Sequence, residues 1–220
     1  MSSEIRLIHT VEVQNELGEG IIWDAQRQCL WWTDIQQCRL YQYFINEDRL
    51  IETTTPERLC CLSPIANSER LVCAFESGFA FFDPVSSKIE WIEKLEADNP
   101  GTRFNDGKTD RQGRFWVGTM MEDEDRATSG GSLYCLDHDL SVSRHLGDLH
   151  ITNSLCWSPD GALAYHTDTP SREIMVYQSA TQPPGLTQPK SSVITNDGCA
   201  PAACKRTRAQ GCRSACPTLW

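Results

Sequence analysis

The 220-residue sequence lacks several features, and each absence excludes a class of protein. No run approaches the ~18 apolar residues that a membrane-spanning helix needs, so we expect no membrane partner. Residues 1–6 lack a basic stretch followed by an apolar one, so we expect no secretion signal and a cytoplasmic protein. Positive charge is also scarce. The 30 acidic side chains outnumber the 20 basic ones, and a net charge of −10 argues against a nucleic acid partner.

Two catalytic patterns and one structural pattern are missing as well. The sequence contains no Gly-x-Ser-x-Gly segment, which argues against a serine hydrolase of the nucleophile-elbow type. The five histidines do not cluster with cysteines, so a site for a soft metal is not expected. Long stretches of 3.6-residue periodicity are absent, which excludes a helical domain.

Cysteine, in contrast, is plentiful. Eleven is an odd number, so the cysteines cannot all pair within one chain. Those before residue 198 lie mostly inside apolar runs, such as 29–32 and 133–136. We therefore expect them to be free and buried as small hydrophobic side chains, which suits a reducing cytoplasm.

Charge and cysteine divide the chain into two parts. Residues 199–220 carry four basic side chains, no acidic one and four cysteines, whereas residues 1–198 carry 16 basic and 30 acidic side chains, a net charge of −14. We interpret 1–198 as the folded part and 199–220 as an aberrant, basic and disordered tail.

Residues 10–180 read as short strands separated by turns, and the strands repeat. Related units, each with a tight turn, a strand, a short loop and a second strand, have first strands near residues 29, 70, 114 and 162. Repeats of roughly 40–50 residues with paired strands are typical of β-propeller blades. The sequence therefore predicts an all-β chain with about four blades plus a fragment, in which residues 191–195 form one more outer strand.

Three segments hold polar residues that such strands do not need. Glu19 lies between two glycines, which let a backbone approach a centre closely, before an apolar strand. Residues 102–110 crowd Arg103, Asn105 and other polar side chains before another strand, and they could hold a hydroxylated or anionic ligand. Asn153 lies between apolar neighbours at the start of a third. Each segment could also be an ordinary turn. Glu19 and Asn153 together offer oxygen ligands for a hard divalent cation.

These motifs resemble the family of regucalcin (senescence marker protein), gluconolactonase and the luciferin-regenerating enzyme. The similarity covers roughly residues 10–198 and rests on Leu-Gly-Glu-Gly at 17–20, Arg-Phe-Asn-Asp-Gly-Lys at 103–108, Gly-Thr-Met at 118–120 and the segment around Asn153. It implies a six-bladed propeller with one divalent metal on its axis. Calcium and zinc are the preferred candidates for this metal, and manganese and magnesium are the second choice. It also implies hydrolysis of a sugar lactone to an aldonic acid.

The resemblance assigns roles residue by residue. It makes Glu19 and Asn153 metal ligands and Arg103 and Asn105 substrate contacts. An acidic residue after Gly-Thr-Met also contacts substrate in the family, and here Glu122 or Asp123 fills that place.

The sequence departs from the family pattern at two places. Ser154 stands where glycine commonly follows the ligand Asn. The third ligand and expected general base, an Asp in a Pro-Asp-Gly turn near residue 200, is replaced by the segment 199–204, and Asp197 comes too early to be assigned. We therefore leave the catalytic base unassigned.

The second departure leads to a hypothesis about the chain itself: residues 200–220 are an out-of-frame product and about two blades are missing. Activity would then be doubtful. The alternatives to a lactonase are a calcium-binding module without catalysis and a truncated product without function. The oligomeric state is not visible in the sequence.

Overall fold

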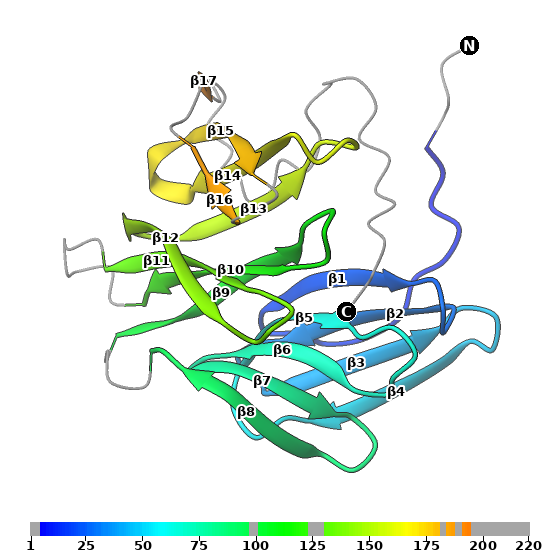
Figure 1. Cartoon of the computed structure of the whole chain (residues 1–220). Helices are drawn as coiled ribbons and strands as arrows, with labels where there is room; N and C mark the ends of the chain where they lie inside the picture. The colour runs from blue at the N-terminus through cyan, green and yellow to red at the C-terminus, as the bar shows by residue number, and fades with distance from the viewer. Residues whose placement is uncertain (1–4, 97–100, 123–129, 181–183, 188–190, 195–220) are drawn as a thin grey trace.

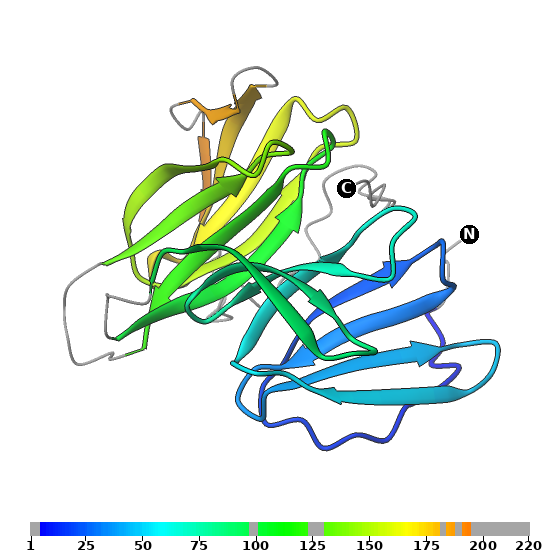
Figure 2. The same ribbon diagram turned by 60° about the horizontal axis from the view of Figure 1, so that its bottom comes forward.

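Short strands and tight turns build four antiparallel sheets in the computed structural model of this protein. The structure describes residues 5–96, 101–122, 130–180, 184–187 and 191–194, the last of these as backbone only. In each sheet consecutive strands pair with one another as a meander. We call the sheets blades 1 to 4 in chain order. Figures 1 and 2 show them following one another in this order, from blue to orange.

Blades 1 and 2 each contain four strands. These strands are β1 (Gly18–Asp24), β2 (Cys29–Asp34), β3 (Arg39–Phe44) and β4 (Arg49–Thr54), then β5 (Leu59–Pro64), β6 (Leu71–Phe75), β7 (Gly78–Asp83) and β8 (Lys88–Lys94).

Blade 3 has the same plan, and blade 4 has two short strands at its outer side. Their strands are β9 (Thr102–Thr109), β10 (Phe115–Met121), β11 (Gly131–Leu136) and β12 (Val142–Leu149), then β13 (Thr152–Trp157), β14 (Leu163–Asp168), β15 (Glu173–Ala180), β16 (Gly185–Leu186) and β17 (Ser191–Ile194). A 3-10 turn, Thr169–Ser171, follows β14. In the part of the chain that the structure describes, no helix is long and apolar enough to cross a membrane.

The predicted all-β propeller with four repeated units is confirmed. The repeated units correspond to the second and third strands of each blade, β2–β3, β6–β7, β10–β11 and β14–β15. The strand expected near 191–195 is present as β17, which pairs with β15. The predicted tail at 199–220 lies outside the described residues.

Hydrophobic clusters lie where successive blades face each other. Trp31 of blade 1 packs with Leu62 and Phe75 of blade 2, and Phe79 of blade 2 packs with Phe104 of blade 3. Between blades 3 and 4 the cluster contains Trp116, Leu133, Cys135, Leu155, Trp157, Ala164 and Tyr177. Burial of these aromatic and aliphatic faces holds the blades together.

The seven cysteines in the described part of the chain are free, and five of them are buried. Cys60, Cys61 and Cys73 have raised pKa values, chiefly because burial disfavours their thiolate forms. The prediction that these cysteines act as small hydrophobic side chains is confirmed for the five.

A buried aspartate at the turn before the second strand explains much of the sequence repeat. In blade 3, Asp110 accepts the Arg114 Nε–H at 2.6 Å and the Trp116 indole N–H at 2.9 Å. In blade 1, Asp24 accepts the Trp31 indole N–H at 3.3 Å in the same way. The Asp–Trp pair therefore recurs in blades 1 and 3, at spacings of seven and six residues, because one carboxylate satisfies both a turn and a buried indole.

A second aspartate repeats at the end of the second strand. Asp34 accepts the backbone N–H groups of Glu16 and Leu17, and Asp168 accepts the backbone N–H of Ile151 at 2.8 Å. Asp168 therefore anchors the start of β13 and is a structural carboxylate of the repeat.

Candidate functional site

The first strands of the blades bring the candidate residues toward each other. Strand β9 packs against β1, β5 and β13. Three of these strands, β1, β9 and β13, carry the same irregularity, in which two residues face one residue of the neighbouring strand. The bulged pairs are Gly20 and Ile21, Asn105 and Asp106, and Ser154 and Leu155. Such bulges change the direction of side chains and are common beside active sites.

Glu19 and Asn153 occupy the same position of the repeat. Glu19 pairs with Thr33 directly before the bulge of β1, and Asn153 pairs with Thr167 directly before the bulge of β13. The two predicted metal ligands are therefore placed by the same local geometry in blades 1 and 4.

The residue after each of them has a left-handed backbone. Gly20 has φ of 65° and Ser154 has φ of 60°. A Cβ at Gly20 would meet no atom closer than 3.8 Å. Gly20 is therefore needed for its φ rather than for room against neighbouring protein atoms, and the expected approach of the backbone to a bound centre stays a prediction. Ser154 adopts the same conformation without that freedom.

Arg103, Asn105 and Asn153 form a connected network between blades 3 and 4. Arg103, which is 4% exposed, donates from Nη1 to the Asn105 Oδ1 at 2.9 Å and to the Phe104 carbonyl at 2.8 Å. Asn105 Nδ2 donates to the Thr152 carbonyl at 2.9 Å and lies 3.4 Å from the Asn153 Oδ1. These contacts fix the amide planes of both asparagines.

Glu122 joins the same network from the other side. It follows β10, and its Oε1 accepts the Arg103 Nε–H at 3.0 Å. Arg58 also donates to both of its oxygens, and this hydrogen bonding lowers the pKa of Glu122 although partial burial acts in the opposite direction. Asp123, the other predicted substrate contact, lies outside the described residues.

The structure thus joins Arg103, Asn105, Glu122 and Asn153 by direct hydrogen bonds. Glu19 is exposed and lies on β1, which packs against β9. The roles predicted for these five residues remain predictions, because geometry alone does not assign ligands.

Two further residues, Arg58 and Cys60, belong to the site, and sequence reasoning did not select them. Both come from the beginning of blade 2. Asp106 lies in the 103–108 motif, but sequence reasoning assigned it no role of its own. Burial raises the pKa of the Cys60 thiol to about 12, while the nearby Arg103 guanidinium acts in the opposite direction. Arg58 lies 64 residues from Glu122, and such a pairing leaves no local pattern in a sequence.

The donor types fit a hard divalent cation, but their number does not complete a site. Glu19 supplies a carboxylate and Asn153 an amide oxygen, both suitable for calcium. Asn153 Nδ2 donates to the Thr169 Oγ1 at 2.8 Å, which fixes the orientation of its amide. Within the described ranges, no group of three or more His, Cys, Asp or Glu residues is placed to hold a metal. Further ligands would have to come from elsewhere.

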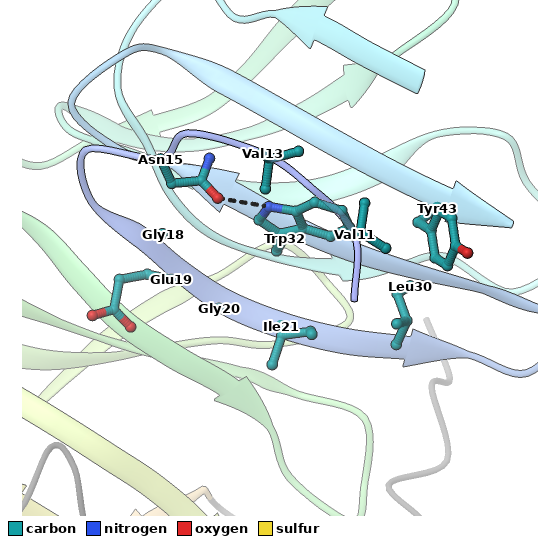
Figure 3. Close-up of a pocket in the computed structure, with 10 residues that line it drawn as sticks. All are labelled: Val11, Val13, Asn15, Gly18, Glu19, Gly20, Ile21, Leu30, Trp32 and Tyr43. Carbon is teal, nitrogen blue, oxygen red and sulfur yellow. Dashed lines mark hydrogen bonds between the residues drawn. The ribbon is translucent and has the colours of Figure 1, made fainter. Parts of the chain in front are cut away.

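A cavity of about 420 Å³ lies on blade 1, beside β1. Its walls are mostly apolar and aromatic, and Trp32 donates its indole N–H to the Asn15 Oδ1 at 3.2 Å (Figure 3). Figure 3 also shows the carboxylate of Glu19 turned away from Trp32 and Tyr43. Glu19 is among the residues that line the cavity, whereas Arg103, Asn105, Glu122 and Asn153 are not, so the cavity is distinct from their network.

Chemically, the network offers hydrogen-bond donors and acceptors in fixed positions. Arg103 and the two asparagine amides suit a ligand with several oxygens. Glu122 is held as an anion by two guanidinium groups, so it accepts hydrogen bonds well but is a weak general base. The arrangement fits binding and polarisation of a polyhydroxylated molecule rather than proton abstraction by Glu122.

Comparison with known proteins gives a consistent result. Residues 17–201 match the model of a family described as the SMP-30/Gluconolactonase/LRE-like region. A 6-deoxy-6-sulfogluconolactonase of Pseudomonas putida is 33% identical over 161 residues, 73% of this chain and 54% of that protein. An L-arabinolactonase of Azospirillum brasilense is 31% identical over 202 residues, 85% of this chain and 66% of that protein.

Solved structures agree in fold. The crystal structure of a calcium-binding protein, regucalcin, from Agrobacterium tumefaciens is 27% identical, with a TM-score of 0.74, and the match covers 83% of this chain and 60% of that one. The chain thus spans between about half and two thirds of the length of the relatives it matches.

Proposed function

Because the chain belongs to the SMP-30/gluconolactonase/LRE-like family, we propose that it binds a sugar lactone and hydrolyses the ring to an aldonic acid. The observation that carries this proposal is the network of Arg103, Asn105 and Asn153, on the first strands of blades 3 and 4, with Glu122, which follows β10. A sugar lactone presents a carbonyl oxygen and several hydroxyl groups, which need donors and acceptors at fixed positions.

We assign Arg103 and Asn105 to hold the oxygens around the lactone ring. Arg103 is buried and anchored through Nε and Nη1, so its guanidinium is oriented before the ligand arrives. Glu122 accepts a hydroxyl hydrogen of the sugar. Preorganised donors of this kind stabilise a carbonyl oxygen as it gains negative charge.

We assign Glu19 and Asn153 as ligands of a divalent cation. Calcium and zinc are the preferred candidates, and manganese and magnesium are the second choice. A bound cation polarises a carbonyl as a Lewis acid. The donor types and the matching repeat positions of the two residues support this assignment. The relative described as calcium-binding supports it further. We keep the cytoplasm as the proposed compartment, which suits the seven free cysteines among the described residues.

The test is gluconolactone hydrolysis by the purified chain with calcium, zinc, manganese and magnesium added in turn. We expect metal-stimulated turnover that disappears in Glu19→Ala and persists in Glu16→Ala, a matched change at an exposed glutamate nearby. Calcium binding without turnover would instead support a binding module. The absence of both calcium binding and turnover would support a product without function.

A further inference from the structure

Arg58 lies directly before β5 in blade 2, yet it reaches the network of blade 3. Its Nη1 and Nη2 donate to Glu122 Oε1 and Oε2 at 2.6 and 2.9 Å, a two-point pairing. Its Nε donates to the Glu76 Oε2 at 2.6 Å. All three guanidinium nitrogens are thus engaged, and the side chain is only 22% exposed.

The backbone holds Arg58 rigidly beside Arg103. The Glu76 N–H donates to the Arg58 carbonyl at 2.9 Å, and the Phe104 N–H donates to the Glu76 carbonyl at 3.4 Å. Phe104 is the neighbour of Arg103 in β9. The turn that carries Glu76 therefore connects the beginning of blade 2 to the strand that carries the site.

A single oxygen links the two arginines. Glu122 Oε1 accepts hydrogen bonds from both Arg58 Nη1 and Arg103 Nε. Arg103 has its other anchor at Nη1, which bonds to Asn105 and the Phe104 carbonyl. Two anchored nitrogens define the plane of a guanidinium. The orientation of the Arg103 guanidinium therefore depends on the position of the Glu122 carboxylate, and Arg58 holds that carboxylate in place.

We propose that Arg58, fixed by Glu76, is a positioning residue of the lactone site: it holds Glu122 so that the Arg103 guanidinium keeps its orientation toward the ligand. This inference rests on the proposed function. A fork-shaped guanidinium is required, because a lysine ammonium is a point charge that cannot hold two carboxylate oxygens and Glu76 in one plane.

The first test is kinetic and uses Arg58→Gln, Arg58→Lys and the control Arg70→Gln in the full chain. Arg70 is also in blade 2 and pairs with Glu90 on the surface, so it matches the change in charge. We expect Arg58→Gln to lower kcat/KM for gluconolactone by about 10- to 100-fold, mainly through kcat. We expect Arg58→Lys to recover part of the loss and Arg70→Gln to match the wild type. Melting temperatures of all variants separate this effect from a loss of folded protein.

The second test does not need turnover. The Nε–H signal of Arg103 is identified by NMR through its loss in Arg103→Lys and is then followed in the Arg58 variants. We expect it to shift and to exchange faster with water in Arg58→Gln, and to stay unchanged in Arg70→Gln. If the wild type hydrolyses no lactone, the proposed function fails and this signal still decides the positioning role. Unchanged kcat/KM or an unchanged Arg103 signal in folded Arg58→Gln would overturn the inference.

Discussion

The carboxylate of Asp106 bridges the bulges of two blades. Its Oδ2 accepts the Ser154 backbone N–H at 2.7 Å, and its Oδ1 accepts the backbone N–H of Gly107 at 3.0 Å. Ser154 and Asp106 are 48 residues apart, and each follows directly after an asparagine of the candidate site. One side chain therefore sets the distance between the strands that carry Asn105 and Asn153.

Replacing Asp106 tests this bridge. Asp106→Asn keeps the size of the side chain but places an amide NH₂ against one of two backbone N–H groups. We expect the free energy of unfolding to fall by about 1.5–3 kcal/mol, since one charge-assisted bond is lost and a donor is left unpaired. Urea unfolding measures the change. Asp139→Asn, at an exposed turn, is the control and should cost clearly less. Equal losses would contradict the bridging role.

Ser154 provides a test of backbone strain. Because its φ is 60°, a Cβ is unfavourable there, and Ser154→Gly should be more stable than Ser154→Ala by about 1 kcal/mol. Comparing glycine with alanine removes the effect of the lost hydroxyl. At Ser143, in strand β12, the glycine variant should instead be less stable than the alanine variant, because glycine weakens a regular strand. Thermal and urea unfolding of the four variants decide the point.

Much of the fold could be predicted from the sequence because the second and third strands repeat regularly. The pair of Asp110 and Trp116 has a counterpart in blade 1 because both pairs share one kind of hydrogen bond, and Asp168 matches Asp34 for a similar reason. The first strands were harder to identify, since their bulges interrupt the alternation on which such predictions depend. The irregular strands are the ones that carry the candidate site.

The site could be predicted only in part. Arg103, Asn105 and Asn153 attract attention because strands do not need them, and the structure joins them by hydrogen bonds. Arg58 could not be found in this way, because it looks like an ordinary charged residue before a strand. Its role arises from contact between blades, and contacts between distant residues are invisible to local patterns.

Asn105 is expected to matter for both stability and binding. In Asn105→Asp, the side chain has nearly the same shape but no longer donates to the Thr152 carbonyl, and its charge faces that oxygen. We expect a loss of about 2 kcal/mol in unfolding free energy and, if the chain is a lactonase, weaker lactone turnover. Asn67→Asp, at an exposed turn, is the matched control and should have little effect. A stable Asn105→Asp protein would show that the amide donor is dispensable.

His166 makes stability depend on pH. It lies on β14 opposite the bulge of β13 and is 1% exposed, and neither ring nitrogen has a hydrogen-bond partner within the described part of the chain. Burial lowers its pKa to about 4, and the carboxylate of Asp168 only partly opposes this effect. In the unfolded chain the pKa of a histidine is about 6.5.

Between pH 6.5 and 4 the unfolded chain therefore binds a proton at His166 that the folded chain does not bind. Stability is fully present above pH 6.5 and falls as the pH drops toward 4, by about 3 kcal/mol from this residue. In His166→Gln this contribution is absent, so the difference in unfolding free energy between wild type and variant should change by that amount between pH 7 and 4. Urea unfolding at a series of pH values measures it. A His166→Gln curve parallel to the wild type would contradict the prediction, because it would mean that the folded and unfolded chains bind a proton at His166 equally.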